Sequence, residues 1–165
     1  MKAESATGIL WVCAQAVLLV LWALSIPADA WSEKLFSNIP LALSGAGMLL
    51  GGCILMFAGT FSLGRNLTPS PVPKRSASLV RQGIYRHVRH PIYGGILLIV
   101  WGITLPFLHL PSLAWAAGLL LFFHLKASFE EQRLASRFPE YEEYRGTTWR
   151  FLPRFHRTKK KSLTP

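Results

Sequence analysis

Four long apolar runs are the feature of this sequence that most restricts its fold. They cover residues 8–26, 41–63, 92–110 and 111–129, and each is about as long as a helix needs to cross roughly 30 Å of hydrocarbon. Inside hydrocarbon every backbone polar group must be bonded within the chain, which favours helices. We therefore predict an all-α, polytopic membrane protein with about four transmembrane helices, formed by a single domain over residues 1–165.

The first run has a second interpretation, as a cleaved signal peptide. Lys2 precedes the run, and the small residues Ala28 and Ala30 follow it in the pattern of a cleavage site. The run is longer than the roughly 7 to 15 apolar residues of a signal core, and Glu4 offsets the positive start. We expect a retained span, with the cleaved signal as the alternative.

Basic residues gather in two blocks that flank the apolar runs. Residues 60–90 contain six Lys or Arg and no acid, and seven more follow Tyr144, in a chain of formal net charge +10. Such blocks favour an anionic membrane surface and predict the cytoplasmic side. They lack the interleaved aromatic residues of a nucleic-acid-binding face, so we expect no nucleic-acid partner. We therefore place the N-terminus, the 64–91 loop and the C-terminus in the cytoplasm.

The connections between the runs give local expectations. Three prolines within residues 68–73 exclude a helix and predict a loop outside the hydrocarbon. In the second run, Gly47 and Gly51 form a small-xxx-small pattern that would let another helix approach closely. The third and fourth runs have almost no polar linker between them and should form a tight hairpin.

The chain beyond residue 129 is expected to leave the membrane as a cytoplasmic helical segment. Pro139 stops or restarts a helix, and residues 139–146 should form a short one that ends at Gly146. Tyr141 and Tyr144 are three residues apart and would share a face of that helix.

Residues 83–95 are the most informative segment for chemistry. Pro91 keeps His90 extended and begins the third span, so the positive end of that helix faces the cytoplasm and favours a carboxylate ligand. The alternative is a basic juxtamembrane anchor with an interfacial tyrosine. Arg89 supplies further donors, and Tyr93 supplies a ring with a hydroxyl. Gly94 and Gly95 have no side chain that would block a ligand.

An acidic pair, Glu130 and Glu131, lies at the end of the fourth run. In a hairpin of the third and fourth spans, this pair would lie beside His90 and Pro91 on the same side of the membrane. One interpretation is a salt-bridge cluster at the surface, which stabilises little when exposed. The functional interpretation is that a carboxylate binds the ammonium or ribose hydroxyls of a zwitterionic cofactor, whose own carboxylate is held by Arg89 or His90.

Taken together, these segments resemble a family of membrane enzymes over a little more than half of the chain. They are similar, in order and spacing, to the isoprenylcysteine carboxyl methyltransferase and phospholipid methyltransferase group. The matching features are Gly64-Arg65-Asn66 with the proline-rich loop, Gly-x-Tyr-x-x-x-Arg-His-Pro-x-Tyr-x-Gly over residues 83–95, Glu130-Glu131 with Leu134, Phe138, Tyr141, Tyr144, and Arg150-Phe151-Leu152-Pro153.

The resemblance implies methyl transfer from S-adenosylmethionine to a lipid or lipophilic small molecule, without a metal. It implies these cofactor-binding residues: Tyr85, Arg89, His90, Pro91, Tyr93, Gly94, Glu130, Glu131, Tyr141 and Tyr144. The expected catalytic residues are Glu131, Arg89 and Tyr93, and an acceptor that must lose a proton has Glu131, His90 or Tyr93 as its base.

The chain departs from this pattern at Thr147, where many relatives have an arginine. If that arginine orients a substrate carboxylate, its absence weakens the case for carboxyl methylation, unless Arg145 or Arg150 substitutes. The acceptor therefore stays open among a prenylated cysteine, a phospholipid amine, a small thiol and another lipophile.

Two other functions are weighed against methyl transfer. Membrane sterol-type reductases resemble this group in their C-terminal architecture and use NADPH, but they are usually longer. A basic membrane anchor without catalysis is the second. It predicts that replacing His90 or Glu131 leaves function intact, whereas removing the charges of the tail does not.

Overall fold

The chain is all-α, as predicted, in a computed structural model that describes residues 2–28, 38–64 and 78–153. The expected proline-rich loop and the basic tail beyond residue 153 lie outside the described residues. The elements are α1 (Lys2–Leu24), α2 (Ile39–Leu63), η3 (Gly83–Arg86), α3 (Pro91–Thr104), η4 (Leu105–Phe107), α4 (Leu110–Arg137) and α5 (Tyr141–Thr147).

Three helices of the described chain are long and apolar enough to cross a membrane, namely Ala6–Leu24, Ile39–Leu63 and Leu110–Arg137. The third predicted span corresponds to a shorter apolar helix, Pro91–Phe107. Its 17 residues would cover about 25 Å at ~1.5 Å per residue, slightly less than the hydrocarbon thickness.

One predicted helix boundary is wrong and another is confirmed. The third span was expected to reach residue 110, but Leu108 adopts a left-handed conformation with φ 47°, which ends the helix before the turn into α4. The chain beyond residue 129 was expected to continue as a helix until Pro139, and α4 does continue to Arg137. The charges of Glu130 and Glu131 do not interrupt this helix, because both side chains are bonded to neighbouring segments of the protein.

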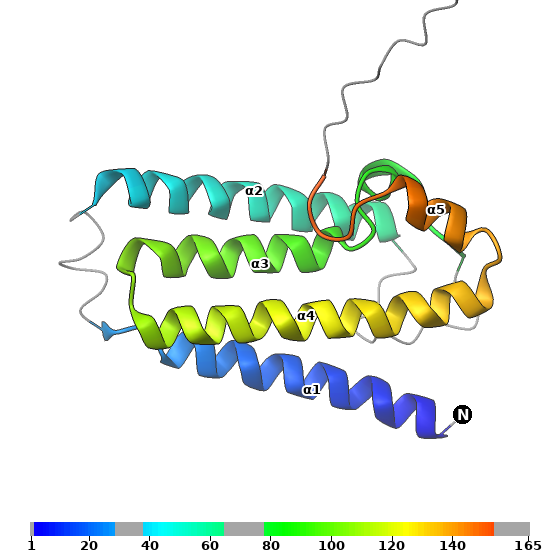
Figure 1. The fold of residues 1–165 in the computed structure, drawn as a ribbon, viewed down its shortest axis with the longest axis horizontal. Coiled ribbons are helices and arrows are strands. Elements are labelled where there is room, and N and C mark those ends of the chain that lie inside the picture. The colour runs from blue at the N-terminus through cyan, green and yellow to red at the C-terminus, as the bar shows by residue number, and fades with distance from the viewer. Residues whose placement is uncertain (1, 29–37, 65–77, 154–165) are drawn as a thin grey trace, which may run out of the picture.

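The helices lie side by side in the order α2, α3, α4 and α1 (Figure 1). The start of α1, the end of α2, the start of α3 and the end of α4 meet at one end of this row, where α5 also lies. The described parts of both basic blocks, residues 78–90 and 145–153, therefore adjoin the same end of the bundle. On α4, the C-terminal part extends past the start of α3, and the 83–90 segment and α5 pack above that extension (Figure 1).

The outer faces of this row are apolar, which fits contact with lipid tails. On a protein surrounded by water, an apolar surface of this extent would drive association. The large exposed hydrophobic side chains include Ile9, Leu10, Val17 and Leu24 on α1, Leu43, Leu50, Ile54, Phe57 and Phe61 on α2, and Leu121 and Leu125 on α4.

Glycines allow α2 and α3 to approach until their backbones are almost in contact. A Cβ on Gly52 would lie 2.7 Å from the carbonyl oxygen of Gly95, and one on Gly45 would lie 2.5 Å from that of Gly102. Such distances are too short for carbon and oxygen, so only glycine fits. The two glycines of the predicted pattern are not the ones that make this contact, because a Cβ on Gly47 or on Gly51 would meet nothing within 4 Å.

Polar and aromatic contacts attach α1 to the rest of the bundle. In its first half, the ring of Trp11 lies 5.4 Å from that of Phe122 on α4. Near its end, the indole of Trp22 donates a buried hydrogen bond of 2.9 Å to Thr104 Oγ1 at the end of α3. A buried hydrogen bond in an apolar seam fixes the register of the two helices.

We predict that Gly52→Ala destabilises the protein by about 1–3 kcal/mol, because the added methyl group would clash with the backbone of α3. Thermal unfolding of the detergent-purified protein measures the loss. Gly51→Ala is the matched control, since its Cβ meets nothing within 4 Å and the gain in helix propensity is the same. Equal melting temperatures for the two variants would contradict this packing.

Candidate functional site

The start of α3 and the C-terminal segment (residues 148–153) are joined by their backbones. The amide of Arg89 donates to Trp149 O at 2.7 Å, and the amide of His90 donates to Arg150 O at 2.8 Å. Pro91 is the first residue of α3, as predicted, and it is buried. Two predicted residues, His90 and Arg89, are thereby placed facing α4.

The carboxylate of Glu131 is the centre of a buried ionic cluster, which we call the Glu131 cluster. Its Oε1 accepts hydrogen bonds of 3.1 Å each from Arg89 Nε, His90 Nε2 and Arg150 Nε. Its Oε2 accepts a bond of 2.7 Å from Arg150 Nη2 and lies 4.0 Å from Arg145 Nε. The Glu131 side chain is 4% exposed. Both oxygens are therefore occupied by groups of the protein.

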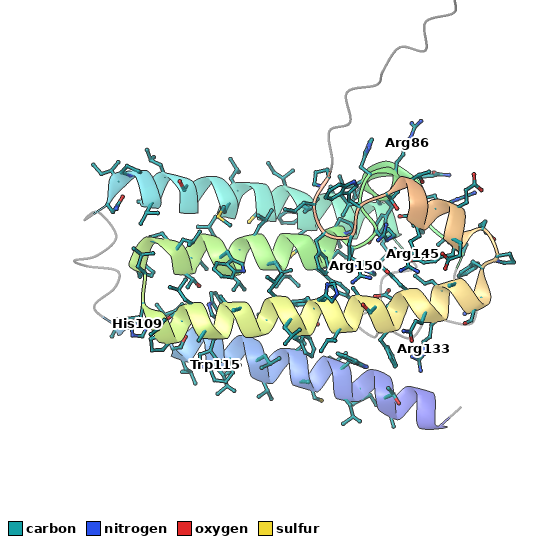
Figure 2. All side chains as sticks on the ribbon, in the orientation of Figure 1. Arg86, His109, Trp115, Arg133, Arg145 and Arg150 are labelled. Atoms are coloured by element: carbon teal, nitrogen blue, oxygen red, sulfur yellow. The ribbon has the colours of Figure 1, made fainter. Side chains whose placement is uncertain are left out.

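Figure 2 shows how these cations are arranged. Arg145 and Arg150 lie between the C-terminal part of the chain and α4, whereas Arg133 lies on the opposite side of α4, toward α1. His109 lies at the far end of the same helix. The cationic side chains that bind Glu131 are thus gathered on one face of α4.

Arg89 is bound on all sides by the protein as well. Besides Glu131, its guanidinium donates to the carbonyl oxygen of Arg145 at 2.9 Å, and to the carbonyl oxygen and the hydroxyl of Thr148. These bonds hold the end of α5 against the start of α3. The sequence places Arg89 and Glu131 in the catalytic set, and that role stays a prediction. Their contacts are those of a structural connection.

Glu130 has different surroundings from its neighbour. Its Oε2 accepts a hydrogen bond of 3.0 Å from the Tyr93 hydroxyl and lies 3.7 Å from His90 Nδ1. The Glu130 side chain is 25% exposed, and no described group bonds its Oε1. Residues next to each other on a helix point about 100° apart, so the two carboxylates cannot share one environment. Glu130 is the carboxylate that is available to a ligand.

Aromatic rings line the neighbourhood of Glu130. The rings of His90 and Tyr93 are stacked, with centroids 5.3 Å apart and an interplanar angle of 3°. The ammonium of Lys126 lies 5.1 Å from the centroid of the Tyr93 ring. Since Lys126 is four residues before Glu130, both side chains lie on one face of α4. We call these four residues the Tyr93 site.

The tyrosines of α5 are buried and pack together, with ring centroids 5.9 Å apart, which confirms their shared face. The Tyr144 hydroxyl donates to Tyr85 O at 2.7 Å and so holds the predicted residue Tyr85 in place. The hydroxyl of Tyr141, a residue 1% exposed, has no hydrogen-bond partner among the described residues. An unsatisfied buried hydroxyl is costly and is a candidate contact for a polar ligand.

Burial sets the protonation of these two tyrosines. It raises the pKa of Tyr141 above its ordinary value, with the negative charge of Glu131 as the second cause. It also raises the pKa of Tyr144 to about 12. Both phenols are therefore protonated at neutral pH and present hydrogen-bond donors.

Gly94 and Gly95 do not leave open space for a ligand, contrary to the prediction. A Cβ on Gly94 would overlap the carbonyl oxygen of Phe151, and one on Gly95 would lie 2.7 Å from Gly52 O. The chain itself fills both positions. Gly94 is required for docking of the C-terminal segment, and a contact of its backbone with a cofactor stays a prediction.

Two side chains of this region were not chosen from the sequence. Arg150 was named in the C-terminal motif and as a substitute for the arginine missing at Thr147, but not as a site residue, although it binds both oxygens of Glu131. Lys126 was not singled out at all. Its signal was present, because a single cation within the apolar run 111–129 is costly in a membrane and points to a specific role.

Comparison with known protein families identifies the class to which the chain belongs. The family model for phospholipid methyltransferases matches residues 41–140. The chain belongs to the phospholipid methyltransferase family. It is therefore an integral membrane protein of a methyltransferase family, as the resemblance of its motifs implied. The matched residues contain His90, Tyr93, Glu130 and Glu131, and they end before α5. No curated protein matches the chain.

We predict that Glu131→Gln destabilises the protein by about 3 kcal/mol, because Arg89 and Arg150 lose a buried counter-charge. The melting temperature falls, and limited proteolysis releases the C-terminal segment earlier than in the wild type. Glu142→Gln is the control, since Glu142 is 65% exposed and, within the described chain, forms its one ion pair with Arg145 at 3.7 Å. A Glu131 variant as stable as this control would show that the cluster does not hold the segment.

Proposed function

We propose that the protein transfers a methyl group from S-adenosylmethionine to a lipophilic acceptor that reaches the site from the membrane. The observation that carries this proposal is the difference between the two glutamates. Glu131 is saturated by cations of the protein, whereas Glu130 presents Oε1 beside the stacked rings of His90 and Tyr93. Membership of the phospholipid methyltransferase family supports the same reaction.

The residues fit the chemistry of S-adenosylmethionine. This cofactor has a sulfonium and an ammonium, both positive, and polar groups on its ribose and carboxylate. Glu130 offers a negative charge, and the faces of aromatic rings attract cations. The hydroxyl of Tyr141 is buried without a partner in the described chain and could bind a polar group of the cofactor. Glu130, His90, Tyr93 and Tyr141 are the residues that we propose to hold it.

When bound, S-adenosylmethionine would supply an electrophilic methyl group on its sulfonium. The residues would contribute mainly by positioning and by excluding water. Tyr93 orients the carboxylate of Glu130 through its hydroxyl. The Glu131 cluster fixes the ring of His90, and the C-terminal segment covers the start of α3.

An acceptor that must lose a proton needs a base, and the structure favours His90 among the three candidates. Glu131 is fully bonded, and the Tyr93 hydroxyl donates to Glu130. An ionised Glu131 only accepts, so His90 Nε2 must be the donor of their shared bond. Its other nitrogen, Nδ1, has no such bond and lies 3.7 Å from Glu130 Oε2, which is the position proposed to accept the proton.

We also propose that the end of the bundle with the site faces the cytoplasm. The described basic residues of both blocks, which include Arg81, Arg86, Arg89, Arg145 and Arg150, adjoin this end, and positive charge favours the cytoplasmic side. A soluble cofactor would then enter from the compartment in which it is made.

The two other functions weighed from the sequence have less support. The family match favours a methyltransferase over an NADPH-dependent reductase. A basic anchor gives no reason for a buried site of stacked rings and carboxylates beneath the C-terminal segment.

We predict that the detergent-purified protein binds S-adenosylmethionine and not NADPH in isothermal titration calorimetry. Glu130→Gln should weaken this binding roughly 10–100-fold, the loss expected for a charge-assisted contact. Glu142→Gln, an exposed change on α5, should bind like the wild type. Binding of NADPH in place of S-adenosylmethionine would support the reductase, and binding of neither would support the anchor.

Orientation can be tested with single cysteines in a chain whose Cys13 and Cys53 are replaced by serine. We predict that Leu108→Cys, at the exposed turn between α3 and α4, reacts with a membrane-impermeant maleimide on intact cells. Arg81→Cys, at the end that carries the site, should react only after the cells are permeabilised. The reverse pattern would place the site outside the cytoplasm.

A further inference from the structure

The C-terminal segment has two different faces. On the inner face, Arg150 bonds Glu131, and Phe151 packs against the apolar core of the bundle. The outer face carries two large apolar side chains, Trp149, which is 49% exposed, and Leu152, which is 47% exposed. Single apolar side chains are common on any protein surface, so the meaning of this pair depends on what surrounds the segment.

The segment runs back from α5 along the bundle, beside α2 and the start of α3 (Figure 1). A Cβ on Gly94 of α3 would overlap the carbonyl oxygen of Phe151 and would lie 3.2 Å from Leu55 Cδ2 on α2. The segment therefore passes close to both helices at the level of Leu55. This residue lies eight positions before the end of α2 at Leu63, which is about 12 Å along the helix.

The helices on both sides of the segment carry exposed apolar side chains at this level. On α4, Ser128 Oγ accepts a hydrogen bond of 3.1 Å from Arg150 Nη1, and Ser128 lies within the apolar run 111–129. The large side chains exposed next to these contacts are Ile54 and Phe57 on α2 and Leu125 on α4. They belong to the outer faces that fit lipid tails. The segment thus lies at a depth at which the flanking helices contact lipid.

Non-helical backbone at such a depth needs hydrogen-bond partners within the protein, because lipid tails offer none. The amide of Trp149 donates to His87 O at 3.1 Å. The amide of Arg89 donates to Trp149 O at 2.7 Å, and that of His90 donates to Arg150 O at 2.8 Å. The polar backbone groups of this stretch are therefore bonded to the residues before α3, and contact with lipid leaves them satisfied.

We propose that the C-terminal segment is inserted in the lipid leaflet beside the site, where contact of Trp149 and Leu152 with lipid holds the segment against the start of α3. Tryptophan has an apolar ring and a polar N–H, which suits the level between tails and headgroups. Leucine gains only from apolar surroundings. The membrane is then a part of the closed site, because the same segment bonds the backbone of His90. Neither contact depends on which donor or acceptor the site binds.

Nitroxide labels distinguish lipid from water around this segment. In the chain whose Cys13 and Cys53 are replaced by serine, Leu152→Cys is labelled and reconstituted into phosphatidylcholine–phosphatidylglycerol vesicles. Oxygen concentrates in lipid, whereas a nickel chelate stays in water. We expect collisions with oxygen to dominate at residue 152, as at Phe57→Cys on the exposed face of α2. Glu142→Cys on α5, at a position 65% exposed, should collide mainly with the nickel chelate.

The comparison with α5 decides the result. A label at residue 152 that meets the nickel chelate as often as the label at residue 142 would overturn the proposal, because the segment would then face water. Trp149→Cys gives a second labelled position, which replaces the first if the melting temperature shows that the Leu152 variant is not folded.

The holding role of the lipid contact is tested with two side chains of similar length in the same vesicles. Leu152→Gln should let the amides of Arg89 and His90 exchange with deuterium roughly five- to tenfold faster, the change expected when about half a leucine side chain loses an apolar contact. Leu152→Met, which stays apolar, is the matched control and should exchange like the wild type. Mass spectrometry of peptides that contain residues 87–90 measures both. Equal exchange in the two variants would show that lipid contact does not hold the segment in place.

Discussion

The buried carboxylate of Glu131 is the interaction on which the site depends. Three segments that are distant in the sequence meet at its two oxygens: the residues before α3, the C-terminal part of α4, and the C-terminal segment. Taking several charges out of water is unfavourable, and mutual pairing with good hydrogen-bond geometry offsets this cost only when every partner is present. The arrangement is therefore cooperative. The same carboxylate that holds the C-terminal segment also fixes the ring of His90. Docking of this segment and placement of His90 therefore depend on one another.

The membrane scaffold could be predicted from the sequence to a large extent, because the length of an apolar run directly reflects the thickness of hydrocarbon. The end of α3 could not, because Leu108 gives no sign of its left-handed conformation. The end of α4 could, since Pro139 marks the point where the helix stops. The close approach of α2 and α3 was expected for the wrong glycines. A spacing of four residues identifies a possible face, but only the position of the neighbouring helix decides which face is used.

The sequence predicted which residues of the candidate site lie near one another, but not which of them bond to one another. The motifs correctly brought His90 and Tyr93 together with the acidic pair. They did not distinguish Glu130 from Glu131, because the sequence does not show in which direction each of two adjacent identical side chains points. The helical rotation of about 100° separates them, and the partners on each side then make one a structural centre and the other an available carboxylate. Arg150 binds Glu131 from 19 residues away through a turn and a short helix, a distance over which local patterns give no geometry.

The unequal lengths of α3 and α4 explain why such a site lies where it does. α3 begins at Pro91, while α4 extends well past that level, so the 83–90 segment, α5 and the C-terminal segment can pack on the extension (Figure 1). A methyl donor is soluble and a lipid acceptor is not, so the proposed reaction requires a place that both can reach. Polar groups at the end of the bundle suit the methyl donor, and the apolar region around Lys126 suits the lipid acceptor. Tyr93 contacts both regions, because its hydroxyl donates to Glu130 and its ring lies beneath the ammonium of Lys126.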